Sequence, residues 1–232
     1  MQATEKTYNF SDSLSRIDEI LNSSDNNYEE RKDIPSRSQL TFTNGFYVDC
    51  TAIFIDMCDS SSLPNKHTRP VVAKLYRCFI SELVALLNGC DICREVNIHG
   101  DCVWGVFNTP YKTDINECIA LAAKANSLIN NLNIKLSKKG YSTIAIKIGI
   151  DYGRALMIKA GHKGSTINDV VWMGDVVNSA CHLANEDRSN KSTLISNIIY
   201  KNLNDHNKSL FQHNYIIDCY EGEIVWPKYE PK

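Results

Sequence analysis

Two aspartates of this chain stand at the ends of hydrophobic segments. Asp56 closes the apolar run IFID, and Asp101 follows Gly100 in EVNIHGDCVWGVF, residues 95–107. This second stretch has two apolar-leaning runs around a tight Gly–Asp pair, which is typical of a β-hairpin. An Asp side chain accepts hydrogen bonds from nearby backbone amides, so it is common in turns and at helix N-caps. Each aspartate taken alone could therefore be structural.

Together the two aspartates indicate a metal site. If the strand that ends at Asp56 lies beside the hairpin, the carboxylates of Asp56 and Asp101 converge at one end of the sheet. Two unpaired carboxylates repel each other, so such a pair usually holds cations. Oxygen ligands suit Mg²⁺ or Mn²⁺, and two such ions about 4 Å apart form a clamp for phosphoryl transfer.

A third stretch, VVWMGDVVNSACHL at residues 170–183, predicts a strand that leads through Met173 and Gly174 into a helix. Asn178 then lies in the first turns of that helix, and a helix N-terminus favours an anion. The plainer alternative is an ordinary helix start with Asp175 near the cap.

The elements that position these residues alternate along the chain. Apolar runs and helical spacing predict a strand, a helix, a hairpin, a helix and two strands joined through Tyr152 and Gly153, followed by shorter elements. In order these are 47–56, 66–88, 92–107, 114–137, 143–151, 154–160, a helix from about Gly174, a strand at 194–195, a helix at 197–204, and strands at 214–219 and 222–226. This order predicts an α+β fold: a ferredoxin-like βαββαβ core, with an antiparallel or mixed sheet, helices on one face and extra C-terminal strands.

The N-terminal part of the chain has a different composition. Residues 1–38 are polar, with a short amphipathic helix predicted near 11–22 and a flexible link over 23–38 that ends near Pro35. We therefore expect an N-terminal helix and linker over 1–38, and one catalytic domain over 39–232.

Composition narrows the function classes. With 25 basic and 27 acidic residues the net charge is −2, which gives no general attraction to nucleic acid or to an anionic membrane. No apolar run reaches the length of a membrane span, and the N-terminus lacks the apolar core of a signal peptide. The nine cysteines then indicate reduced thiols in a cytoplasmic protein. Cys90 and Cys93 form a CxxC without a second ligand pair, which favours two half-buried thiols over a zinc site.

Three stretches line up with one family. IFIDMCDSSSL, VNIHGDCVWGVF and WMGDVVNSACHL, in this order, resemble the class III nucleotidyl cyclases, and the resemblance covers about residues 45–227. It implies that Asp56 and Asp101 bind two Mn²⁺ or Mg²⁺ ions and that the backbone carbonyl of Met57 also touches a metal. It implies that Asn178 steadies the ribose. It further implies a head-to-tail homodimer in which one subunit supplies the aspartates and the other supplies Asn178.

The reaction implied by this resemblance is attack of the ribose 3′-hydroxyl on the α-phosphate, with release of pyrophosphate. One metal ion would lower the pKa of the hydroxyl, and the second would hold the triphosphate and neutralise the leaving group. No protein nucleophile is needed.

The positions that read the base depart from the family pattern. Adenylate cyclases carry Lys and guanylate cyclases carry Glu four residues before the second aspartate, where this chain has Asn97. The second reader, Asp in adenylate cyclases, is replaced by Val171. Purine edge groups would be left unpaired, whereas the amide of Asn97 both donates and accepts and could meet a pyrimidine. Trp172 could narrow the pocket, or it could belong to the core.

A further departure lies on the helix of Asn178. The family usually has Arg four residues after the asparagine, and here that residue is His182. Histidine is often neutral, and loss of such an Arg can raise the barrier by several kcal/mol. Another cation could substitute, with four candidates in this chain: Arg154, Lys159, Lys163 and Arg188. Alternatively the enzyme is slow, or His182 is an ordinary polar residue of a helix.

GIDYGRALMIKAGHKGS (149–165) and WMGDVVN resemble the Pycsar anti-phage pyrimidine cyclases in particular. This implies that UTP or CTP is converted to cyclic UMP or cyclic CMP, which switches on a separate effector, with no nucleic acid or membrane partner. Asn97 does not choose between uracil and cytosine; UTP is favoured as the more frequent substrate of the family. Two alternatives stay open: a degenerate domain that binds nucleotide or a partner without turnover, for which His182 argues, and a purine cyclase with other base contacts.

Overall fold

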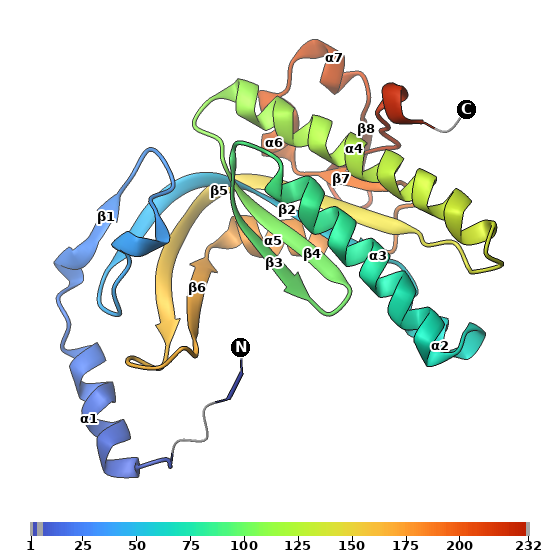
Figure 1. Ribbon diagram of the computed structural model, residues 1–232. Coiled ribbons are helices and arrows are strands. Elements are labelled where there is room, and N and C mark those ends of the chain that lie inside the picture. The colour runs from blue at the N-terminus through green and yellow to red at the C-terminus, as the bar shows by residue number, and fades with distance from the viewer. Residues whose placement is uncertain (1, 4–6, 231–232) are drawn as a thin grey trace.

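The computed structural model describes residues 2–3 and 7–230, and within them a nine-stranded mixed sheet is the centre of the fold (Figure 1). The strand order is β3-β4-β2-β5-β7-β9-β8, with β1 beside β2 and β6 beside β5. The strands are β1 (Tyr28–Glu30), β2 (Gly45–Met57), β3 (Cys93–His99), β4 (Cys102–Asn108), β5 (Ile146–Gly161), β6 (Asn168–Met173), β7 (Thr193–Ile195), β8 (Gln212–Asn214) and β9 (Cys219–Gly222).

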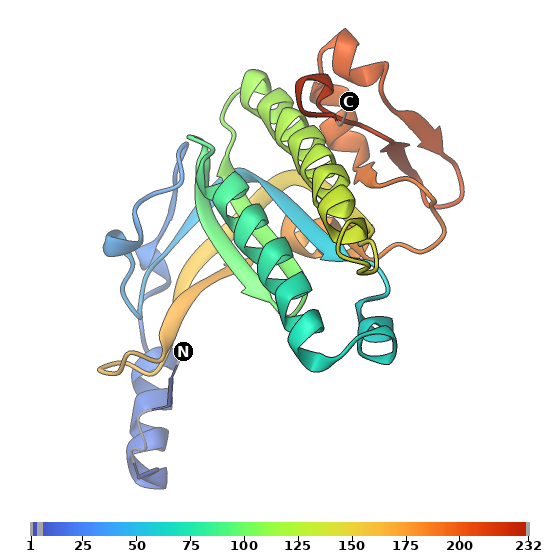
Figure 2. The same ribbon diagram turned by 45° about the vertical axis from the view of Figure 1, so that its right-hand side comes forward.

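The α-helices occupy both sides of this sheet. They are α1 (Phe10–Leu21), α2 (Leu63–Lys66), α3 (Arg69–Asn88), α4 (Lys112–Ser137), α5 (Asp175–Ala184), α6 (Asn197–Asn202) and α7 (Asp205–Lys208). Figure 2 shows α3 (teal) and α4 (green to yellow) side by side over one face, with α5 (orange) behind the sheet. The α+β fold class predicted from the sequence is confirmed. The expectation that the helices lie on one face is corrected, because α5 packs on the face opposite α3 and α4.

Strand β2 separates the two halves of the core. It pairs antiparallel with β4 on one side and with β5 on the other. Alternate residues of a strand point to opposite faces. Ile53 and Ile55 accordingly pack in the core under α3 and α4, whereas Ala52 and Phe54 pack in the core under α5. Asp56 continues the series of Ala52 and Phe54 and therefore faces the α5 side.

Several predicted elements are corrected by the structure. The strands expected over 143–151 and 154–160 are one continuous strand, β5, because Tyr152 and Gly153 keep their pairing with Thr51 and Cys50 of β2. The last two strands are shorter than expected and end by residue 222. The chain instead turns between Asn214 and Cys219, where Asp218 has a φ of 48°.

The segment before β2 is packed on the sheet rather than free. Strand β1 pairs in parallel with β2, and Ile34 and Leu40 are buried in the α5-side core. The backbone N–H of Ile34 donates to Oδ1 of Asn108 in β4 over 2.8 Å. The flexible link expected over 23–38 is therefore wrong for residues 28–38. The division of the chain into two domains at residue 39 stays a prediction.

The helix expected near 11–22 is present as α1. Its N-cap is Asn9, whose side chain accepts hydrogen bonds from the backbone N–H groups of Ser11 and Asp12. Across the described residues, none of the helices has both the length and the apolar character needed to cross a membrane.

Helix α5 approaches the sheet most closely at Gly149 of β5. A Cβ at this position would overlap the backbone of α5 at Ala180 and Ala184. We expect Gly149→Ala to push α5 away from the sheet and to lower the free energy of unfolding by about 1–3 kcal/mol, the range for overpacking a core. Denaturant unfolding measures this.

Gly153→Ala is the matched control, since a Cβ there meets the Cβ of Val176 at an ordinary 3.5 Å. Equal stability of the two variants would contradict the close packing of α5.

Candidate active site

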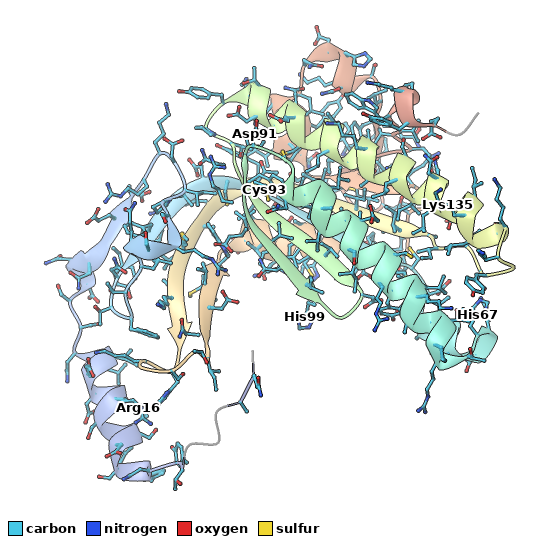
Figure 3. The ribbon with its side chains drawn as sticks, viewed as in Figure 1. Arg16, His67, Asp91, Cys93, His99 and Lys135 are labelled. Carbon is cyan, nitrogen blue, oxygen red and sulfur yellow. The ribbon has the colours of Figure 1, made fainter. Side chains whose placement is uncertain are left out.

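Asp56 and Asp101 lie at the same end of the sheet. Asp56 is the penultimate residue of β2 and stands opposite Cys102 of β4. Asp101 precedes Cys102 in the turn between β3 and β4, where Gly100 has a φ of 63° that suits glycine. In Figure 3 His99 marks the free end of the hairpin beside this turn. A central strand and a tight hairpin thus hold the two carboxylates.

Burial and the charge of Asp101 both affect the ionisation of Asp56. The pKa of Asp56 is raised from 3.8 to about 6, first by burial and then by the negative charge of Asp101, while a hydrogen bond with the Cys102 thiol lowers it. Among the described residues no ion pair is found for Asp56 or Asp101. A half-buried carboxylate pair without a cation is costly, and a bound cation would remove the repulsion.

This donor set fits small hard cations. In the described part of the chain no group of three or more His, Cys, Asp or Glu side chains could hold a metal ion. The site therefore offers two carboxylates and the backbone oxygens at the end of β2, near Met57. Mg²⁺ is commonly bound in this way, by one or two carboxylates together with water and substrate phosphates. The Met57 side chain itself is buried under α3 and α4.

Asn97 lies on the same face of the sheet as Asp56. It stands opposite Trp104 of β4, which in turn stands opposite Phe54 of β2. The Phe54 and Trp104 rings are stacked, with centroids 4.9 Å apart. Asn97 is half-buried at the edge of this aromatic row. Alternate residues of a strand share a face, so Phe54, two residues before Asp56, lies on the same face as Asp56. This spacing is the signal by which the sequence could have identified the aromatic row.

Val171 and Trp172 point to opposite faces of β6. Trp172 is 7% exposed and packs in the α5-side core with Met157, which agrees with the core interpretation of this residue. Its indole N–H is buried and has no partner among the described residues. Val171 is 41% exposed on the other face. The side chains of Val171 and Trp172 therefore do not line one common pocket surface.

Asn178 and His182 lie one turn apart on the exposed side of α5. The helix turns Val176, Ala180 and Ala184 toward the sheet, so Asn178 and His182 point away from it. Cys181 of α5 lies closer to the aspartates: burial raises the pKa of its thiol, and the charge of the Asp56 carboxylate raises it further. Within one chain, Asn178 and His182 do not face the aspartates.

The four candidate cations differ in their surroundings. Arg154 pairs with Glu30, Lys163 with Glu19 (2.5 Å) and Arg188 with Glu186 (2.6 Å). Lys159 instead lies over the ring of Phe42, 5.1 Å from its centroid. Three of the four are thus already engaged by carboxylates.

Known proteins resemble this chain over most of its length. The family model described as "Adenylate and Guanylate cyclase catalytic domain" matches residues 44–220. A protein of Gulbenkiania mobilis named uridylate cyclase is 42% identical over 212 residues, which cover 87% of this chain and 82% of the relative. A uridylate cyclase of Treponema porcinum is 38% identical over 221 residues, covering 91% and 77%.

Solved structures share the fold. The adenylyl cyclase CyaB from P. aeruginosa superposes with a TM-score of 0.63 at 19% identity, covering 73% of this chain and 85% of that structure. The guanylyl cyclase Cya2 also has a TM-score of 0.63, at 15% identity, covering 80% and 96%. At these identities the likeness concerns the arrangement of helices and strands.

The burial of Asp56 and its closeness to the charge of Asp101 predict a pH effect in the metal-free protein. Because the folded-state pKa of Asp56 is about 6, above the ordinary 3.8, the stability it contributes is fully present below about pH 4 and is lost as the pH rises through 6. We expect Asp101→Asn to remove the neighbouring charge and lower the pKa of Asp56, as measured by NMR titration of its carboxyl carbon. Addition of Mg²⁺ to the native chain should lower the pKa as well.

Glu29→Gln is a suitable control, because this exposed residue pairs with Arg31 in the N-terminal segment rather than with the site. A titration of Asp56 that is the same with and without the Asp101 charge would show that the two carboxylates do not share a site.

Proposed function

Because this chain belongs to the class III nucleotidyl cyclases, the family of adenylate and guanylate cyclase catalytic domains, we propose that it converts UTP to 3′,5′-cyclic UMP and pyrophosphate. The observation that carries the choice of base is the likeness to two proteins named uridylate cyclase over most of the chain, at 42% and 38% identity. CTP remains the second pyrimidine to test, since the amide of Asn97 can turn to suit either base.

The aspartate pair would hold the divalent ions of the site. Asp56 and Asp101, with the backbone carbonyl of Met57, would bind two Mg²⁺ or Mn²⁺ ions. When bound, such ions activate the 3′-hydroxyl and neutralise the triphosphate and the leaving pyrophosphate. Since the pKa of Asp56 is about 6 even in the metal-free chain, this carboxylate is mostly ionised at neutral pH and ready to bind a cation. The central strand and the tight hairpin would hold the two carboxylates in position before a cation binds.

The base would meet Asn97 and the strand that carries Val171. Asn97 offers one acceptor and one pair of donors, which match the edge of a pyrimidine. Val171 has no polar atom to satisfy the second set of purine edge groups, so a bound purine would leave hydrogen-bonding groups unpaired. Trp172 packs in the core beneath this strand and would support it rather than touch the base.

Asn178 and His182 would complete the site from a second copy of the chain. Both side chains are exposed on α5 and turned away from their own sheet. In a head-to-tail homodimer they would meet the aspartates of the partner. Asn178 would orient the ribose, and His182 would occupy the place of the family's arginine beside the transition state. A protonated His182 could stabilise the developing charge there.

The biological role follows from the proposed product. A cyclic pyrimidine nucleotide is a diffusible signal, and we propose that it activates a separate effector in anti-phage defence. All nine cysteines are free in the structure, which fits the reducing cytoplasm where nucleoside triphosphates are found.

A panel of four substrates tests the proposed reaction. The purified chain is incubated with Mn²⁺ and separately with ATP, GTP, CTP and UTP, and the products are identified by mass. We expect cyclic UMP as the main product, because Asn97 and Val171 lack the purine contacts. A cyclic purine would retain the metal site but contradict this pocket, and no product from any substrate would favour a domain that binds without turnover.

Mixing two inactive variants tests whether the active site is shared between subunits. Asp56→Ala and Asn178→Ala should each abolish turnover alone. In randomly mixed dimers half of the molecules are heterodimers with one intact site, so about a quarter of the wild-type activity should return. Mixing Asp56→Ala with Asp101→Ala is the matched control, because both variants damage the same half-site and no intact site forms. If the first mixture also stays inactive, the site does not draw on two chains.

A further inference from the structure

An arginine far from the known motifs links two strands of the proposed base pocket. Arg37 lies in a short 3₁₀ turn between β1 and β2. Two nitrogens on one edge of its guanidinium contact Glu95 of β3: Nε donates to Oε1 and Nη2 to Oε2, each over 2.7 Å. Nη2 also donates to Oδ1 of Asp169 in β6 over 2.7 Å. The Glu95 side chain is only 4% exposed, whereas that of Arg37 is 53% exposed.

The two carboxylates occupy matching places on their strands. Glu95 is two residues before Asn97 on β3, and Asp169 is two residues before Val171 on β6. Residues two apart in a strand lie on the same face, about 7 Å from each other. Arg37 therefore bridges the two strands that carry the proposed base positions. Its contact on each strand is two residues before the position proposed to meet the base.

This guanidinium is held in a fixed orientation. A bidentate pair with a buried carboxylate sets both the position and the plane of the group, and the contact to Asp169 adds a third point. Nη1 has no hydrogen-bond partner among the described residues, and the half-exposed side chain leaves it open to a ligand. The two N–H groups of Nη1 are thus held beside Glu95, which is two residues from Asn97 on β3.

We propose that Arg37 is the residue that selects uracil over cytosine, with its Nη1 donating to O4 of the base. The inference rests on the proposed function and names the group that would choose between the two pyrimidines. Position 4 is where the bases differ, because uracil carries a carbonyl acceptor there and cytosine an amino donor. An arginine has donors only, so it pairs with the carbonyl and opposes the amino group.

Asn97 cannot make this choice alone. Its amide can flip to present either acceptor or donor to N3 and position 4, so it accommodates both bases. A neighbouring group that can only donate hydrogen bonds, such as a guanidinium, disfavours the amide orientation that suits cytosine. Selectivity between uracil and cytosine therefore requires a group like Arg37, and loss of one hydrogen bond to a charged donor typically changes discrimination about tenfold or more.

The test compares UTP, CTP and 4-thio-UTP, in which sulfur replaces O4 and accepts hydrogen bonds weakly. For the native chain we expect kcat/KM to fall at least about tenfold from UTP to CTP and to fall also from UTP to 4-thio-UTP. Arg37→Lys keeps a positive charge but has a single nitrogen, which pairs with Glu95 and leaves no second nitrogen to reach O4, so it should bring both ratios close to one. The change should appear mainly in KM, and binding of 3′-deoxy-UTP, which cannot cyclise, should weaken in parallel.

Two further variants guard against a purely structural effect. Arg37→Met combined with Glu95→Gln removes the charge of Glu95, which would otherwise be buried without a partner, and thermal unfolding shows whether the fold is kept. Arg31→Ala is the matched control, because Arg31 lies in the same segment but pairs with Glu29 and lies over Phe46. It should leave both substrate ratios unchanged.

The outcomes separate this inference from the proposed function. A native chain that makes no cyclic pyrimidine would overturn the proposed function itself. A native chain that makes cyclic UMP, with substrate ratios unchanged in a folded Arg37 variant, would overturn only the role of Arg37. A native preference for CTP would overturn both the choice of UTP in the proposed function and the role of Arg37.

Discussion

The placement of two half-buried carboxylates at one end of the sheet is the constraint on which the proposed site depends. Asp56 and Asp101 come from different elements, and the fold holds them near each other although burial and proximity both raise the pKa of Asp56. Such strain persists only where the surrounding structure determines it. Here β2 is paired on both sides along its length, and the hairpin has only two residues between its strands. The same rigidity would suit the proposed cation site, because little order would have to be gained on binding.

The packing of α5 determines the direction in which Asn178 and His182 point. The backbone of this helix lies against Gly149, and its small residues Ala180 and Ala184 make the approach possible. With that side against the sheet, Asn178 and His182 must point outward, since they lie on the opposite side of a helix with 3.6 residues per turn. Each chain therefore carries the two aspartates and the pair of Asn178 and His182 on surfaces that do not face each other, which is the geometry that the proposed two-fold dimer would satisfy.

The sequence predicted the parts of this fold that depend on local pattern. The long helices, the hairpin and the strand before Asp56 follow from apolar periodicity, and the structure contains them within a few residues. Tyr152 and Gly153 were expected to join two strands because Gly often marks a break. The structure keeps one strand there, since pairing with Thr51 and Cys50 outweighs local propensity. The face chosen by α5 depends on long-range packing, which no local pattern contains.

The candidate site divides in the same way. The aspartates stand out because a charged residue is unusual beside a buried strand, and Asn97 stands out against a family pattern. Arg37 has no such signal, because its partner Asp169 is 132 residues away in the chain and its segment has the composition of a loop. Glu95 offered only a weak signal, as an acidic residue next to Val96 in a predicted strand. Only the fold shows that this carboxylate is buried and paired.

An ion pair with a buried carboxylate, such as that of Arg37 with Glu95, needs a reason beyond stability. Taking a carboxylate out of water costs several kcal/mol, and well-packed apolar residues of similar size often stabilise a protein equally well or better. A pair of this kind is of more use where a charged group must be kept in one orientation. Glu95 is nearly inaccessible while half of the Arg37 side chain is exposed, so the buried partner acts as the anchor and the exposed partner is the group presented. With Asp169 holding the same nitrogen from the other strand, the outer edge of the guanidinium is the part left for a ligand, and an edge that can only donate suits a base that accepts.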